Sequence, residues 1–268
     1  MHNRKIFFSD LDGTLLTGDK KISPATMRAL RHFTEQGHLF VICTGRPLPS
    51  AMKVAEEYGL TALRNLYVVA FNGAEICDPA SGKVLHRVPL PVRTAQFIYD
   101  EARDWGLYCQ TYAADHIVTR ADHENLRFNQ RIARMPAQFT DDLLSHLRED
   151  PCKCLVVEQK DFDLLERFRV HMRERLDDSY ELIYSAPWYL EIFSAAAGKG
   201  HAVRWLCDHL QIPVSSSLAA GDEENDISMI RAAGLGIAMK NATERVREAA
   251  DVVTEEDNDH DGLVPFFS

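Results

Sequence analysis

The chain has 268 residues, of which 46% are hydrophobic and 26% are charged, as in ordinary globular proteins with a substantial core. Its formal net charge is −10, which disfavours binding to nucleic acid or to an anionic membrane. No apolar run approaches the roughly 18 residues of a membrane-spanning helix, and the N-terminus turns polar too early for a signal peptide. We therefore expect a cytoplasmic protein that binds neither nucleic acid nor membrane, whereas the oligomeric state stays open.

The first part of the chain alternates strand and helix signals. A helix is predicted to begin at Ser23-Pro24, because serine caps helix N-termini and proline is tolerated in the first helical turn. A second helix is expected over residues 50–58. Strand, helix, strand, helix, strand is the order of a parallel sheet with right-handed crossovers. Three apolar runs predict the buried strands of that sheet, at residues 5–9, 39–43 and 66–71.

The pattern changes after about residue 82. Alternating strands, helices and two expected hairpins, within residues 107–119 and 180–193, indicate an antiparallel α+β module. From Lys199 the strand–helix alternation returns. The sequence therefore predicts an α/β fold: a Rossmann-like, doubly wound parallel sheet core interrupted by an inserted cap. The expected boundaries are residues 1–82 and 188–268 for the core and 83–187 for the cap.

Polar signatures follow four of the predicted core strands. Ligands of open parallel sheets bind outside the carboxyl ends of the strands, so we expect these signatures to converge on one crevice. Asp10 and Asp12 would point to the same side of their strand, and two neighbouring carboxylates require a cation or a shared proton. With Asp222 they offer the hard oxygen ligands that Mg²⁺ prefers. The signatures lie at residues 10–14, 44–46, 72–73 and 221–226.

These residue types suit phosphoryl transfer. A carboxylate such as Asp10 can attack phosphorus and form an acyl phosphate, if a metal offsets charge and an acid such as Asp12 protonates the leaving group. Thr44 offers a hydroxyl group and Lys199 a compact cation for phosphate oxygens. Plainer interpretations exist for each motif alone: Lys199, between glycines, would be a solvated loop residue. The histidines, including His116, show no ligand-like spacing and are expected on the surface or in the core.

Together, the polar signatures at the strand ends and Lys199 resemble the motifs of the haloacid dehalogenase-like (HAD) phosphatases. Residues 8–16 resemble the first motif of that family and Thr44-Gly45-Arg46 the second, while Lys199 resembles the third. Residues 221–226 resemble the fourth motif. The large insert, with Asn72-Gly73 before it, is similar to that of the Cof-type subfamily.

The resemblance implies a role for each matching residue. Asp10 would be the nucleophile and a Mg²⁺ ligand, and Asp222 a further ligand. Asp12 would be the general acid/base and would bind Mg²⁺ through its backbone carbonyl. Asp226 would orient Lys199 or a metal-bound water. The phosphate would be held by the backbone of Leu11 and by Thr44, Gly45, Lys199 and Asn225. Candidate contacts for the rest of the substrate are Arg46, Asn72, Gly73 and the cap residues Tyr108, Tyr112, His116 and Arg120.

The implied activity is hydrolysis of a small phosphorylated metabolite, a sugar phosphate or a similar ester. A phosphomutase or phosphotransferase using the same aspartyl phosphate is the alternative. A non-enzymatic role ranks last, because Asp10 and Asp12 are both present.

Overall fold

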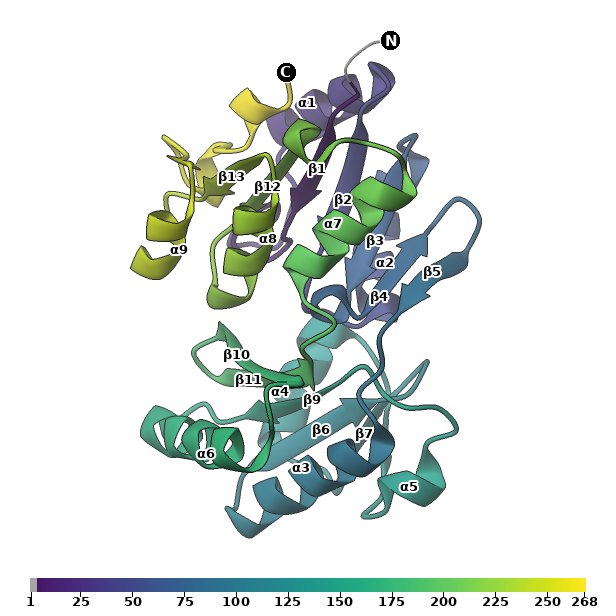
Figure 1. Ribbon diagram of the computed structural model, residues 1–268, viewed down its shortest axis with the longest axis vertical. Helices are drawn as coiled ribbons and strands as arrows, with labels where there is room; N and C mark the ends of the chain where they lie inside the picture. Colours follow the sequence, from purple (N-terminus) through teal and green to yellow (C-terminus); the bar gives the residue numbers. More distant parts are fainter. Residues whose placement is uncertain (1–3) are drawn as a thin grey trace. The chain divides into compact units, whose positions relative to one another are not determined.

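The computed structural model describes residues 4–268, and His2 lies outside the described residues. The chain divides into two compact units (Figure 1). One unit combines the residues up to Arg87 with Gly198–Ser268, and the other is Val88–Ala197. Within the described part of the chain, no helix is both long and apolar enough to cross a membrane.

The first unit contains an eight-stranded sheet in the order β14-β13-β12-β1-β2-β3-β4-β5. The six strands from β14 to β3 pair in parallel, and β4 and β5 continue the sheet antiparallel. This arrangement confirms the predicted parallel α/β fold. The strands are β1 (Ile6–Ser9), β2 (Leu39–Cys43), β3 (Leu66–Ala70), β4 (Glu75–Asp78), β5 (Lys83–Arg87), β12 (Ser217–Gly221), β13 (Leu235–Ala238) and β14 (Val252–Val253).

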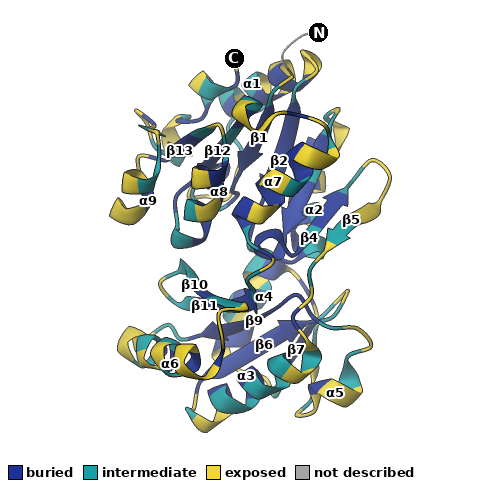
Figure 2. Ribbon diagram, viewed as in Figure 1, coloured by how far each residue is buried: buried dark blue, intermediate teal, exposed yellow. Residues whose placement is uncertain are grey.

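Hydrophobic side chains cover both faces of this sheet, because successive residues of a strand point to opposite sides. Phe8 of β1 packs in one cluster with Leu206 and Met229 of the covering helices, whereas Phe7 contacts the rings of Phe33 and Phe267. Figure 2 shows the central strands buried and the outer helix faces exposed. The helices are α1 (Pro24–Glu35), α2 (Leu48–Glu57), α7 (Lys199–His209), α8 (Ile227–Ala232) and α9 (Glu244–Ala249).

The start of α1 follows the sequence prediction. The side chain of Ser23 accepts a hydrogen bond from the backbone N–H of Thr26, and Pro24 occupies the first turn. This cap satisfies one of the donors that the first turn of a helix leaves without a partner.

The second unit contains a six-stranded sheet in the order β10-β11-β9-β6-β7-β8. All its pairs are antiparallel except β7 with β8, and both expected hairpins form, as β6–β7 and β10–β11. Ile98 of α3 and Phe168 of α6 pack with Val156 in its core. The elements are α3 (Val92–Asp104), β6 (Tyr108–Tyr112), β7 (Ile117–Thr119), α4 (Glu124–Ala133), β8 (Ala137–Phe139), α5 (Leu143–His146), β9 (Lys153–Val157), α6 (Phe162–Arg175), β10 (Tyr180–Ala186) and β11 (Tyr189–Ser194).

Both unit boundaries lie further along the chain than residues 82/83 and 187/188, where the sequence pattern predicts them. β5 pairs with β4 and therefore belongs to the sheet of the first unit. β11 pairs with β10 and β9 and therefore belongs to the second. Strand pairing over such distances leaves no local signal in the sequence.

Candidate active site

The order of the central strands brings three polar segments together. β1 lies between β12 and β2, so that Asp10, Asp222 and Thr44 each follow the carboxyl end of adjacent strands. The hydrogen bonding between β1 and β12 continues past the end of β1, since the N–H of Asp10 donates to the carbonyl of Ala220 at 3.0 Å. These strand ends therefore lie side by side at one edge of the sheet, as the topology predicts.

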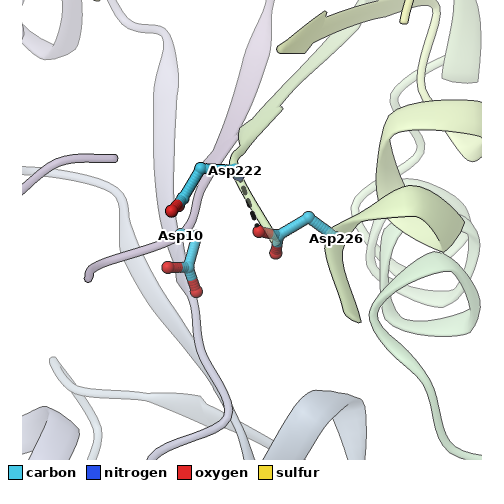
Figure 3. A group of neighbouring side chains, drawn as sticks. All are labelled: Asp10, Asp222 and Asp226. Atoms are coloured by element: carbon cyan, nitrogen blue, oxygen red, sulfur yellow. Dashed lines mark hydrogen bonds between the residues drawn. The ribbon is translucent and has the colours of Figure 1, made fainter. Parts of the chain in front are cut away.

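Three carboxylates form a cluster at this edge of the sheet. One oxygen from each of Asp10, Asp222 and Asp226 lies within 4.8 Å of the others (Figure 3). The hydroxyl of Thr14 donates to Oδ1 of Asp222 at 2.7 Å. The backbone N–H groups of Asp222 and Glu223 donate to Oδ2 of Asp226 at 2.9 and 3.1 Å. Asp226 is therefore held by its own loop, in the position of a helix-capping residue.

Gly13 lets the loop after Asp12 pass close to this cluster. Its φ is +81°, and a Cβ atom at this position would lie 2.2 Å from Oδ2 of Asp222. A side chain here would have to displace the carboxylate, so only glycine fits both the backbone conformation and the space.

Lys199 connects the carboxylates. Its side chain is fully buried, and its Nζ lies 2.6 Å from Oδ1 of Asp10 and 2.6 Å from Oδ1 of Asp226. Burial by itself lowers the pKa of the ammonium group, but the two carboxylates outweigh it and hold the pKa above its usual value. The alternative interpretation of Lys199 as a solvated loop residue is therefore wrong.

The cluster carries more negative than positive charge. Three carboxylates and one ammonium group give a formal charge of −2. Burial raises the pKa of Asp10 and of Asp222 well above the usual aspartate value, and the neighbouring carboxylates raise both further; only for Asp10 does Lys199 counteract this. A divalent cation would restore the balance.

The donor set fits such a cation. No residue in the described part of the chain donates a hydrogen bond to Oδ2 of Asp10 or to Oδ2 of Asp222. Both oxygens of Asp226 are already engaged by Lys199 and by backbone amides. The free carboxylate oxygens of Asp10 and Asp222 are thus of the type that can bind a divalent cation, whereas the carboxylate of Asp226 is engaged within the protein.

Asp12 has a different environment from Asp10. Nε and a terminal nitrogen of Arg46 bind its two carboxylate oxygens at 2.7 Å each, and Nζ of Lys20 lies 2.8 Å from Oδ1. Burial raises the pKa of Asp12, but the two cations outweigh it and lower the pKa to about 2. Lys20 could not be selected from the sequence, because it belongs to none of the four motifs.

Asn72 and Gly73 contact two of the other motif segments. Nδ2 of Asn225 donates to Oδ1 of Asn72 at 2.9 Å, and both side chains are buried. Gly73 has a φ of +99°, and a Cβ atom there would lie 2.4 Å from the carbonyl oxygen of Gly198. The segment is thus packed directly against the residue before Lys199.

The second motif is tied to the same segment. The carbonyl of Thr44 accepts a hydrogen bond from the N–H of Asn72 at 3.0 Å, and its hydroxyl accepts one from the N–H of Arg46 at 3.1 Å. Leu11 is fully buried beside Asp10. The first unit therefore brings together the residues selected from the sequence at its four strand ends.

A family model of haloacid dehalogenase-like hydrolases matches residues 7–267. The chain belongs to this family. The membership expected from the four motifs, including its Cof-type branch, is confirmed.

Two phosphatases of Bacillus subtilis and one solved structure match this HAD-like hydrolase over nearly their whole length. The phosphatase YwpJ of Bacillus subtilis is 28% identical over 282 residues, covering 96% of each chain. The 5-amino-6-(5-phospho-D-ribitylamino)uracil phosphatase YitU of the same organism is 27% identical over 264 residues, covering 96% of this chain and 94% of its own. A haloacid dehalogenase-like hydrolase from Bacteroides thetaiotaomicron superposes with a TM-score of 0.87 at 30% identity, covering 98% of both chains.

Proposed function

We propose that this HAD-like hydrolase is a Mg²⁺-dependent phosphatase that hydrolyses a small phosphate monoester through an aspartyl phosphate on Asp10. The observation that carries the proposal is the position of Asp10. Lys199 holds one oxygen of its carboxylate, and no described residue donates to the other, which faces a cluster short of positive charge. Such a carboxylate can act as a nucleophile toward an electrophilic phosphorus.

Asp10 attacks in the first half of the reaction. A bond forms between its carboxylate oxygen and phosphorus, and the bond from phosphorus to the leaving oxygen breaks. The leaving oxygen takes a proton from Asp12 and departs as an alcohol. In the second half water attacks the phosphorus of the aspartyl phosphate and gives a proton to Asp12. The bond between phosphorus and the Asp10 oxygen breaks, so that inorganic phosphate and the Asp10 carboxylate are released.

Asp12 lies where it can serve both halves, two residues after the nucleophile. In the structure it is an ion-paired carboxylate, which is the form that takes a proton from water. To donate a proton in the first half, it must lose part of its contact with Arg46 and Lys20. The negative charge of an arriving phosphate ester offers both cations another partner.

The remaining residues hold the phosphate and the metal. Lys199, the hydroxyl of Thr44, the amide of Asn225 and the backbone around Leu11 and Gly45 supply hydrogen-bond donors for phosphate oxygens. The Mg²⁺ ligands would be Asp10, Asp222 and the backbone carbonyl of Asp12. When bound, Mg²⁺ offsets the charge that develops on the transferred phosphoryl group.

The second unit, we propose, acts as the cap that determines substrate preference. It is inserted between the second and third motifs, and the chain returns from it at Gly198, directly before Lys199. Sugar phosphates and related metabolites are the expected substrates, and Arg46, Asn72 and Gly73 are candidate contacts from the first unit. All six cysteines are free thiols, which supports a reducing compartment such as the cytoplasm.

Phosphate release from an aryl phosphate and from a panel of phosphorylated metabolites tests the proposal. We expect activity that requires Mg²⁺ and disappears in Asp10→Asn even when Mg²⁺ is added in large excess, with the overall fold retained. A variant of Asp10 that still turns over would exclude the aspartyl phosphate. Isomerised phosphate esters without net release of phosphate would instead indicate a mutase.

A further inference from the structure

Two histidines of the second unit face each other. His116 lies in the turn between β6 and β7, and His146 is the last residue of α5. Their Nε2 atoms are 3.4 Å apart, and the ring planes are nearly perpendicular, at 86°. The residues are 30 positions apart in the sequence, which is why no ligand-like spacing revealed them.

Asp115 determines which nitrogen of His116 carries the proton. Its Oδ1 lies 2.6 Å from Nδ1 of His116. A carboxylate only accepts hydrogen bonds, so we assign the proton to Nδ1. The lone pair of the neutral ring is then at Nε2, the atom that lies 3.4 Å from Nε2 of His146. Carboxylates that bind histidine in this way orient the ring and make it a more basic metal ligand.

The separation of the two nitrogens fits a shared metal ion. Two ligands bound to one tetrahedral Zn²⁺ at about 2.05 Å are separated by about 3.3 Å, which is twice that length times the sine of half the tetrahedral angle. The observed 3.4 Å is close to this value. In the absence of a metal the same two nitrogens form a long hydrogen bond, whose donor depends on the tautomers of the two rings.

We propose that His116 and His146 bind one divalent transition-metal ion of the kind that prefers imidazole, such as Zn²⁺. Imidazole nitrogen suits Zn²⁺, Cu²⁺ and Ni²⁺, whereas Mg²⁺ prefers oxygen ligands. The site is therefore chemically distinct from the carboxylate cluster of the first unit. It does not depend on the proposed phosphatase activity.

Both ligands lie on well-defined segments. The N–H of Ala113 donates to the carbonyl of His116 at 2.9 Å and closes the β6–β7 turn. On the other side Leu143 is fully buried, and its N–H donates to Oε1 of Gln96 at 2.7 Å. Ligands held in this way lose little freedom when a metal binds.

Solvent would complete the coordination. Both histidines are only partly buried, and the described residues contain a single group of three or more potential ligands, which is the aspartate cluster. Two protein ligands leave two tetrahedral positions for water. We expect weaker binding than at structural zinc sites with four protein ligands. A bound ion would connect the β6–β7 turn to α5 and stabilise the second unit by mass action.

The site is tested by calorimetric titration of Zn²⁺ into the untagged protein, with Mg²⁺ in excess. We expect one saturable Zn²⁺ per chain. His116→Gln and His146→Gln should each abolish saturable binding. Asp115→Asn, which keeps both imidazoles, should weaken binding by about 10–100-fold. His32→Gln removes an exposed histidine of α1 and should bind like the parent protein.

Three results would overturn the proposal. The first is the absence of saturable binding to the parent protein, which would leave an ordinary contact between two rings. The second is unchanged binding in either histidine variant. The third is binding that disappears in Asp222→Asn alone, because the ion would then occupy the carboxylate cluster. Should a histidine variant fail to fold by circular dichroism, unchanged affinity in Asp115→Asn would by itself refute the site.

Discussion

Lys199→Met removes the cation from the buried carboxylate cluster and keeps most of the side-chain volume. The ammonium group donates to Asp10 and to Asp226, both at 2.6 Å. Each hydrogen bond to a charged partner contributes about 1.5–3 kcal/mol, so the loss of both predicts about 3–6 kcal/mol. Removing one partner of a buried ion pair destabilises by about 3–5 kcal/mol, which agrees. We expect the first unit to lose about 3–5 kcal/mol of unfolding free energy without Mg²⁺, and phosphatase activity to disappear.

The pH dependence of this loss has a definite sign. In the variant the carboxylates repel one another without compensation, and their pKa values, already raised by burial, rise further. Protonation at lower pH removes this repulsion. The deficit in unfolding free energy should therefore shrink from mildly alkaline to mildly acidic pH, and added Mg²⁺ should also reduce it.

Urea unfolding, monitored by hydrogen exchange of peptides from β1 and α7, reports on the first unit alone. Lys21→Met is the matched control, because that lysine is exposed in the same unit. The control should change the unfolding free energy little. A loss below about 1 kcal/mol in Lys199→Met at mildly alkaline pH would refute the assigned role of the buried ammonium group.

Three further changes test other parts of the site. Thr14→Val removes the hydrogen bond to Asp222 and should weaken Mg²⁺ binding by about 10–100-fold in a titration, with Asp222 still present. Gly73→Ala places a Cβ atom 2.4 Å from a backbone oxygen at a positive φ, so both the melting temperature and kcat should fall. Arg46→Met removes the bidentate partner of Asp12, whose carboxyl pKa should rise from about 2 toward the usual aspartate value in an NMR titration.

Each of these three changes has a control or a contrary outcome. Gly82 also has a positive φ, of +67°, but no atom lies within 4 Å of the place that a Cβ would take, so Gly82→Ala isolates the backbone strain from the steric clash. Equal melting temperatures for the Gly73 and Gly82 variants would contradict the packing argument. Unchanged Mg²⁺ affinity in the Thr14 variant, or an unchanged titration midpoint of Asp12 without Arg46, would contradict the corresponding contacts.

Local signals in the sequence predicted the fold well. Apolar runs of five to six residues contain the buried strands β1, β2 and β3, because strands covered on both faces have no polar side. The cap of α1 at Ser23 and the β6–β7 hairpin also formed as expected. Such features depend on neighbours within a few residues, and a single sequence records them.

The motif residues of the candidate site were found for a related reason. They follow strand ends, and parallel strands place their carboxyl ends along one edge of the sheet. Asp10, Thr44 and Asp222 could therefore be grouped before their distances were known. The sequence did not predict which side chains these residues contact. Examples are the ion pair of Lys20 with Asp12 and the hydrogen bond between Asn225 and Asn72.

The sequence by itself determined the doubly wound core, the inserted α+β module and the set of acidic, hydroxyl and amine residues at the strand ends. Only the tertiary structure decided that Lys199 is buried between Asp10 and Asp226, that β5 and β11 belong to different sheets than expected, and that His116 meets His146. The physical reason is the distance along the chain. Lys199 and Asp10 are 189 residues apart, and contacts of that range form through strand order and packing, which leave no periodic pattern in the sequence.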